Sequence, residues 1–170
     1  MIEGTLVRLR ARRPDDVARQ HDWYADPDTT AGLLMPYPRA AGEWSAAEPV
    51  AYDKAVFAVE DRDSGTTIGT AGLLHPSPEH RRAMGFFVIG DRAYRGRGYG
   101  LDLVRTVCRF GFESMNLAKV ELEVIADNAR AVRAYERAGF VREVHRRRAL
   151  WVDGAWRDEY LMGLFPEELR

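Results

Sequence analysis

The sequence YRGRGYG at residues 94–100 decides how this chain is interpreted, because it places three glycines and two arginines soon after the apolar run GFFVI at 85–89. Glycine lets a backbone approach a ligand closely, because no Cβ is in the way. The first N–H groups of a helix are unpaired and carry a partial positive charge, which favours anions. The stretch therefore predicts either a plain strand-to-helix turn or a loop that binds phosphate.

Two common phosphate-binding motifs are excluded at this position. No G-K-[ST] follows the glycines, so the stretch is not a P-loop, and a dinucleotide fingerprint would read G-x-G-x-x-G. On these residues alone, the turn and the phosphate-binding loop are supported about equally.

Strands and helices alternate on both sides of the glycines. Apolar and alternating runs predict strands at 5–11, 55–61, 66–74, 82–90 and 118–126, and a final hairpin over 147–165 that turns at Asp153-Gly154. Helices are predicted over 13–26, over 101–115, and over 128–140 with an end at Gly139. This order predicts the α+β class, with one domain built around a central mixed sheet.

The composition limits the classes of protein to which the chain can belong. Its 170 residues predict a single domain over 1–170 with a core that needs no disulfides. The net charge of -1 gives no electrostatic footprint for nucleic acid or for an anionic membrane. Cys108 is the single cysteine, which excludes a disulfide framework and a cysteine-based zinc site, so no metal is expected. No apolar stretch has membrane-spanning length and no signal peptide is recognisable, which predicts a soluble, cytoplasmic protein.

Taken with its surroundings, the glycine stretch resembles a known family signature. RGRGYG at 95–100 resembles the [Q/R]-x-x-G-x-[G/A] motif of the GNAT superfamily of N-acetyltransferases. NARAVRAYERAGF at 128–140 resembles the second segment of that family, N-x-x-A-x-x-x-Y-x-x-x-G-F. RLRARRPDD, WYADPD and GAWRDEYLMGL resemble the branch that contains ribosomal-protein N-terminal acetyltransferases and spermidine acetyltransferases. The resemblance covers nearly the whole chain and implies a three-layer α/β/α fold with a mixed, mostly antiparallel sheet.

The resemblance implies acetyl-CoA as the cosubstrate and assigns its contacts. The strand before the loop is expected to splay from its neighbour and to bind the pantetheine arm through its backbone at Phe87, Val88 and Ile89. Backbone N–H groups of the loop are expected to bind the pyrophosphate, and they belong to Arg95, Gly96, Arg97, Gly98, Tyr99, Gly100 and Leu101.

Two residues of the second segment are further candidates for binding the cosubstrate. Asn128 precedes a predicted helix and is therefore expected to be its N-cap, and the resemblance also makes it a pantetheine contact. Arg133 either reaches a phosphate of CoA, as the resemblance implies, or is an ordinary solvated residue on the helix.

Tyr135 is the catalytic residue that the resemblance implies. Attack of an amine on the thioester expels a thiolate, and a phenol with a pKa of about 10 can protonate that thiolate in a dry site. Its helical position alone favours a tyrosine packed on the core, and the motif reverses that preference.

The base that deprotonates the amine is not evident from the sequence. Many relatives of this branch have a glutamate on the strand before the loop, in a pattern like A-E-L-G, where this chain has AMG at 83–85. Because the Met84 side chain cannot accept a proton, the candidates are His75, Glu60 and Glu123, directly or through water. His75 has a suitable intrinsic pKa near 6.5 but is favoured as a surface residue. Glu123 alternates with apolar neighbours, so we expect it on the opposite face of the sheet.

Together these features predict an acetyl-CoA-dependent N-acetyltransferase that acts on a primary amine by direct attack in a ternary complex. The acceptor stays open between a peptide or protein N-terminus, a polyamine and another small amine, because residues 26–53 and the last hairpin are expected to select it. The methionine at position 84 leaves an alternative, a weakly catalytic or non-catalytic sensor that binds acyl-CoA. Nucleic acid and membrane are not expected as partners, and a homodimer is left open.

Overall fold

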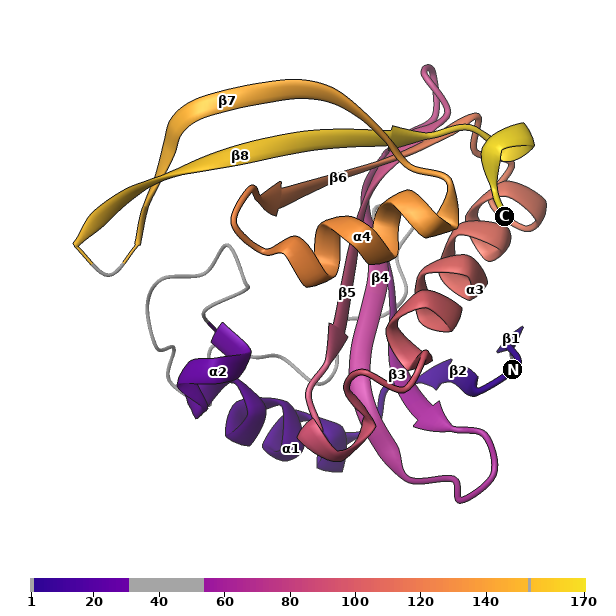
Figure 1. Cartoon of the computed structure of the whole chain (residues 1–170). Helices are drawn as coiled ribbons and strands as arrows, with labels where there is room; N and C mark the ends of the chain where they lie inside the picture. The colour runs from indigo at the N-terminus through magenta and orange to yellow at the C-terminus, as the bar shows by residue number, and fades with distance from the viewer. Residues whose placement is uncertain (1, 31–53, 153) are drawn as a thin grey trace.

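All strands of the computed structural model, which describes residues 2–30, 54–152 and 154–170, belong to one eight-stranded sheet (Figure 1). The strand order is β1-β2-β3-β4-β5-β6-β8-β7. The strands are β1 (Ile2–Glu3), β2 (Val7–Ala11), β3 (Lys54–Asp61), β4 (Thr67–Ser77), β5 (Arg82–Ile89), β6 (Lys119–Ile125), β7 (Val141–Val152) and β8 (Ala155–Leu164). Strands β5 and β6 pair in parallel and the other neighbours pair antiparallel, which confirms the predicted mixed, mostly antiparallel sheet.

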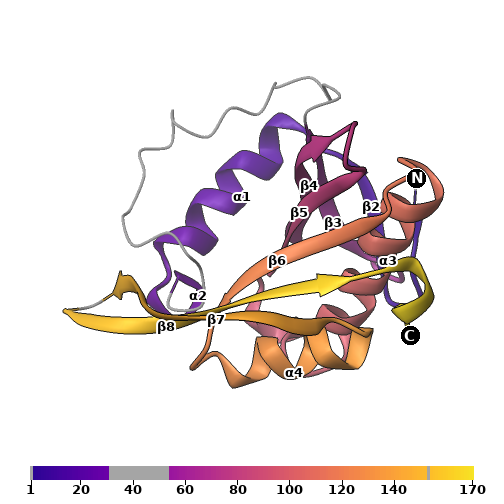
Figure 2. The same cartoon turned by 90° about the horizontal axis from the view of Figure 1, so that it is seen from above.

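Helices cover both faces of this sheet (Figure 2). The α-helices are α1 (Pro14–Ala25), α2 (Pro27–Thr30), α3 (Tyr99–Glu113) and α4 (Ala129–Ala138), and short 3-10 helices are η2 (Arg92–Tyr94) and η3 (Pro166–Glu168). Helices α1 and α2 lie on one face, and α3 and α4 lie on the other, so the three layers are as expected (Figure 2). No helix within the described ranges is long and apolar enough to cross a membrane.

The hydrophobic core lies between the sheet and the layer of α3 and α4. Alternation along β2 sends Leu9, which is fully buried, into this core and sends Arg10 to the face that carries α1. Strand β6 follows the same rule, with Leu122 and Val124 buried in the core and Glu123 half-buried on the opposite side. The sheet therefore separates an apolar face from a face on which charged side chains meet α1.

The start of α3 and the end of α4 both depend on a glycine. Helix α3 begins at Tyr99, two residues before the predicted start, and its N-cap Gly98 adopts a φ of 92° that disfavours other residues. Gly139 ends α4 with a φ of 112°, as the sequence predicts.

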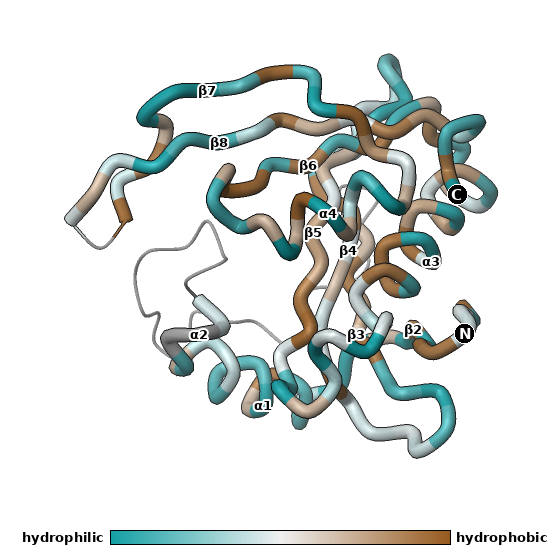
Figure 3. The backbone as a smooth tube through the Cα atoms, viewed as in Figure 1, coloured by the Kyte–Doolittle hydropathy of each residue, from teal (hydrophilic) through white to brown (hydrophobic). Residues whose placement is uncertain are grey.

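The predicted limits of the last hairpin are wrong at its first strand. Strand β7 begins at Val141, not at residue 147, and it is the exposed edge of the sheet. Residues 142–148 are exposed on both faces and largely charged, so they lack the period-two signal of a half-buried strand (Figure 3). The two-residue strand β1 was likewise not predicted. Most of the stretch 26–53 and Asp153 of the predicted turn lie outside the described residues.

Candidate active site

Strands β5 and β6 part from each other in the middle of the sheet. Their parallel pairing covers Arg82 with Lys119, Ala83 with Val120, and Met84 with Glu121, and it ends there. Beyond that point β5 continues along β4 and β6 continues along β8 (Figure 1). We call the space that opens after the last pair the β5–β6 separation. Because the inner edges of both strands lose their partners there, their backbone groups can accept an added extended chain.

Phe87, Val88 and Ile89, the predicted pantetheine contacts, all lie on β5 within this separation. Val88 is buried, whereas Phe87 and Ile89 are partly buried against the core. The carbonyl of Ile89 accepts a hydrogen bond of 3.0 Å from Arg95 Nε, so the unpaired edge of β5 is more open toward Phe87 than at its end.

The residues between β5 and α3, Gly90–Gly98, form what we call the glycine loop. Within the described part of the chain, the N–H groups from Gly96 to Leu101 donate no hydrogen bond, whereas that of Arg95 donates to the Arg92 carbonyl over 3.1 Å. Gly96 and Gly98 both have positive φ angles, 75° and 92°, and a Cβ at Gly96 or Gly100 would meet no atom within 4 Å. This run of unpaired donors beside open space suits an anion.

The two arginines of the glycine loop have different surroundings. Arg95 is half-buried, and its guanidinium donates to the carbonyls of Ile89 and Gly90 and to the hydroxyl of Thr29. Its charge is therefore directed into the protein. Arg97 is exposed, with its guanidinium 5.9 Å from the ring centroids of both Tyr94 and Tyr99. The Arg97 guanidinium also donates to the Ala93 carbonyl over 3.2 Å, but because it is exposed it is, of these two side chains, the one that can reach a ligand from the surface.

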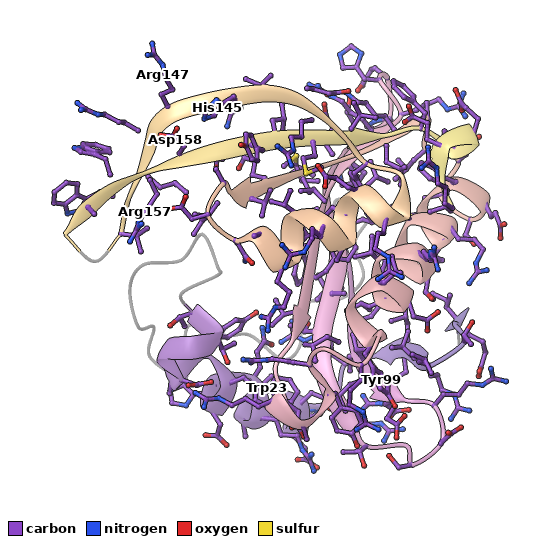
Figure 4. All side chains as sticks on the ribbon, in the orientation of Figure 1. Trp23, Tyr99, His145, Arg147, Arg157 and Asp158 are labelled. Carbon is purple, nitrogen blue, oxygen red and sulfur yellow. The ribbon has the colours of Figure 1, made fainter. Side chains whose placement is uncertain are left out.

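Tyr99 anchors the first turn of α3. Its hydroxyl donates to Asp61 over 2.9 Å, and its ring meets that of Tyr94 edge-on at 5.1 Å. Burial, together with the neighbouring Asp61 carboxylate, raises the pKa of the Tyr99 phenol. The side chain is thus committed to the core (Figure 4), and only the backbone N–H is available for binding.

Tyr135 projects from α4 toward the β5–β6 separation. Its ring lies 5.9 Å from that of Phe87 and 5.9 Å from that of Phe140. Burial raises the pKa of its phenol to about 12, and the nearby Cys108 thiol adds to the effect. No hydrogen bond of its hydroxyl is found among the described residues. A phenol that is protonated at neutral pH and has no acceptor among the described residues can donate its proton to a ligand.

Asn128 and Arg133 occupy the positions that the sequence indicates. The Asn128 side chain accepts a hydrogen bond of 3.2 Å from the N–H of Ala131, which confirms the predicted N-cap. Arg133 is exposed on α4. Its pairing with a CoA phosphate stays a prediction.

Two of the three candidate bases are poorly suited to that role. Glu60 is buried on β3 and hydrogen-bonded to Arg10, a pair that joins β3 to β2. His75 is exposed in the irregular part of β4, with a φ of 50°. Glu123 lies on β6 beyond the last β5–β6 pair, and its carboxylate accepts a 2.6 Å hydrogen bond from Arg146. Of the three, Glu123 is the one on the edge of the β5–β6 separation.

Glu121 is a further carboxylate at this site, and no sequence motif points to it. It pairs with Met84 in the last register position before the strands part, so the two side chains share a face. The carboxylate is nearly buried and accepts hydrogen bonds from Lys119 Nζ at 3.0 Å and from Arg82 at 3.4 Å. The parallel register, which no local pattern encodes, was needed to find it.

Comparison with known proteins agrees with this geometry. Residues 7–141 match the model of the acetyltransferase (GNAT) domain. The chain is 32% identical over 102 residues to the spermidine N(1)-acetyltransferase of Vibrio cholerae, covering 60% of this chain and 58% of that enzyme. It is 37% identical over 102 residues to the N-alpha-acetyltransferase RimI of Mycobacterium tuberculosis, covering 59% and 61%. The chain thus spans less than two thirds of the length of either relative.

The fold has close counterparts among solved structures. The crystal structure of the Vibrio cholerae spermidine N-acetyltransferase in complex with CoA and spermine matches with a TM-score of 0.84 at 24% identity, over 96% of this chain and 98% of that one. The family model covers most of the chain, and the arrangement of sheet and helices is shared. The chain therefore belongs to the GNAT family of acetyltransferases, whose acyl donor is acetyl-CoA.

Proposed function

We propose that the protein transfers the acetyl group of acetyl-CoA to a primary amine. The observation that carries this proposal is the β5–β6 separation next to the unpaired N–H groups of Gly96 to Leu101. The unpaired strand edge suits the amide groups of a pantetheine arm, and the unpaired donors suit a pyrophosphate. Phe87 to Ile89, the backbone of the glycine loop and Asn128 are the residues we assign to this binding.

In the proposed reaction the amine nitrogen forms a bond to the thioester carbon, and the carbon–sulfur bond breaks. Tyr135 gives its hydroxyl proton to the departing sulfur, and a base takes the proton that the amine loses, so the charges balance. The phenoxide left on Tyr135 is reprotonated through solvent after the products depart.

The high pKa of Tyr135 is compatible with this role. A phenol with a pKa of about 12 is a weak acid toward an ordinary thiolate, whose conjugate thiol has a pKa of about 8.5. A thiolate in a dry site, however, holds its proton more tightly, because its charge is poorly solvated. Burial raises the pKa of the neighbouring Cys108 thiol in the same way. The desolvation that weakens the acid therefore also strengthens the base that it protonates.

We propose a polyamine such as spermidine as the first acceptor to test, since relatives bear the name spermidine acetyltransferase. A peptide N-terminus is the second, because another relative is named an N-alpha-acetyltransferase. On the α1 face, Glu121 and Glu123 are paired with Lys119, Arg82 and Arg146. A polyamine, which is an extended cation, would have to displace these partners or bind to other carboxylates.

The decisive experiment measures thiol release from acetyl-CoA with spermidine, small amines and peptides of varied N-terminal residue. Steady release with one acceptor class supports the transferase. The second candidate is an acyl-CoA sensor, which Met84 favours because that side chain cannot act as a base. Tight acetyl-CoA binding by calorimetry with no turnover across the whole panel would favour the sensor.

A further inference from the structure

Residues 23–30, which comprise the end of α1, Asp26 and helix α2, are packed against the glycine loop, and we call them the α1–α2 corner. Trp23 lies over Gly90, where a Cβ would overlap its indole ring. Gly90 is buried, and its N–H donates to the Ile68 carbonyl on β4 over 2.9 Å. The corner therefore rests on the point where β5 ends and the glycine loop begins.

Polar contacts continue this packing along the loop. Asp26 accepts hydrogen bonds from two guanidinium nitrogens of Arg92, one of them from Nε at 3.0 Å, so the pair is bidentate. Arg92 belongs to η2, and the Arg92 carbonyl accepts the N–H of Arg95 over 3.1 Å. This ion pair thus ties the corner to the turn that leads into the glycines.

A single hydroxyl makes the second connection. Thr29 is buried, and its hydroxyl donates to Asp26 over 2.8 Å while accepting from Arg95 over 2.6 Å. The same guanidinium of Arg95 also holds the carbonyls of Ile89 and Gly90. The chain of contacts runs from Asp26 through Thr29 to Arg95, the residue directly before the unpaired N–H groups.

We propose that Asp26 and Thr29 are positioning residues for the glycine loop. We also propose that they couple acetyl-CoA binding to helices α1 and α2, which lie on the face of the sheet opposite α3 and α4 (Figure 2). The proposal rests on the proposed function, because it assumes that the loop binds the pyrophosphate. Neither side chain belongs to the glycine loop or to α3. Their effect is exerted through Arg92 and Arg95, which hold the N–H groups of Gly96 to Leu101 in one arrangement. Binding pays less ordering entropy when donors are already fixed.

Thr29→Val tests this most directly, because it keeps the shape of the side chain and removes the bridging hydroxyl. We expect the Kd for acetyl-CoA to rise about three- to tenfold, and amide hydrogen exchange to speed up in peptides covering 92–101 but not in those covering 119–125. Thr29→Ser keeps the hydroxyl and should restore both values. Asp26→Asn should change both in the same direction as Thr29→Val, and by less, because its ion pair is partly exposed.

Glu3→Gln is the matched control for the loss of charge. Glu3 pairs with Arg8 at 2.9 Å and with Arg62 at 3.3 Å, away from the glycine loop, so its substitution should leave the Kd unchanged. In the unmodified protein, addition of acetyl-CoA should slow exchange in peptides covering 96–101 and, through the contacts of Thr29, in peptides covering 20–30.

The outcomes separate the two proposals. A folded Thr29→Val protein with an unchanged Kd overturns the positioning role, whether or not exchange in the loop is faster, because a merely structural contact lowers only the melting temperature. Protection confined to 96–101 in the unmodified protein overturns the coupling while leaving the proposed function intact. If acetyl-CoA neither binds nor protects 96–101, the proposed function fails and the positioning role fails with it.

Discussion

At the scale of single residues, the site depends on what each side chain already contacts. The Tyr135 hydroxyl has no hydrogen-bond acceptor among the described residues, whereas that of Tyr99 is committed to Asp61. The two tyrosines are therefore suited to different roles. The same reasoning separates Arg95, whose guanidinium faces inward, from the exposed Arg97.

Tyr135→Phe tests the proton donor. It removes one hydroxyl and keeps the ring that meets Phe87, so we expect kcat to fall about 10²–10⁴-fold with little change in KM for acetyl-CoA. Because the described structure shows no hydrogen bond to lose, the melting temperature should stay nearly constant. Single-turnover rates are needed in case product release limits kcat. Normal turnover would mean that Tyr135 is only a core residue and that the acid lies elsewhere.

Gly98→Glu tests the glycine loop. It places bulk and negative charge where we expect the pyrophosphate, so the Kd for acetyl-CoA should rise by at least about tenfold by calorimetry. Gly65→Glu is the matched control, since Gly65 also has a positive φ, 70°, and open space around it, but lies in the turn between β3 and β4. If both variants bind acetyl-CoA equally well, the loop does not bind the pyrophosphate.

At the scale of elements, the sequence predicts the helices, loops and caps that local patterns encode. It does not predict which residues are brought together by the pairing of distant strands. The glycine loop, α3, α4 and the N-cap role of Asn128 follow from spacing and residue type. The position of Glu121 opposite Met84 depends on the register of two strands that are far apart in sequence, so no local pattern reveals it. The inward direction of Arg95 depends on Thr29, 66 residues earlier in the chain. The sequence predicts the start of strand β7 at residue 147 and not at Val141, because an edge strand exposed on both faces needs no alternation of apolar and polar residues.

Strand β6 also carries the strongest candidate for the base, Glu123. With a polyamine acceptor, we expect Glu123→Gln to lower kcat/KM about 100-fold at pH 7. The rate of the variant should approach that of the unmodified protein as the pH nears the pKa of an alkylamine, about 10, where the free amine needs no base. Arg146→Gln is the matched control, because it breaks the same ion pair and leaves the carboxylate. Parallel pH profiles for the Glu123→Gln and unmodified proteins would exclude Glu123. The same profile measured with Glu121→Gln would then test the carboxylate opposite Met84.

At the scale of the whole molecule, the layer that carries α1 is joined to the sheet by charge, and the layer of α3 and α4 by apolar packing. Arg10 on β2 is the centre of this polar contact, since it donates to Asp16 of α1, to Glu60 of β3 and to Thr67 of β4. The contact lies on the same side as the α1–α2 corner. The stability of the layer that carries α1 should therefore depend on pH more strongly than that of the apolar core.

Asp16→Asn tests this dependence. Burial alone would raise the pKa of Asp16, but hydrogen bonds from Arg10, from the Arg13 N–H and from Thr67 outweigh it and lower that pKa below its ordinary value. A carboxyl group with a lowered pKa in the folded state stabilises the protein above the pKa of the unfolded chain, about 3.9, and loses that contribution as the pH falls through the folded value. Asp16→Asn should therefore cost about 1–3 kcal/mol at pH 7.

The cost should shrink below about pH 4, where the unmodified protein also begins to lose this contribution. Urea unfolding of both proteins at pH 7 and at successively lower pH measures the difference. Asp15→Asn is the matched control, because Asp15 is the exposed neighbour in the same first turn of α1 and should change stability little at any pH. The free energies of unfolding of Asp16→Asn and of the unmodified protein could instead differ by the same amount at every pH. That result would show that the shape of the Asp16 side chain, and not its charge, holds α1 to the sheet.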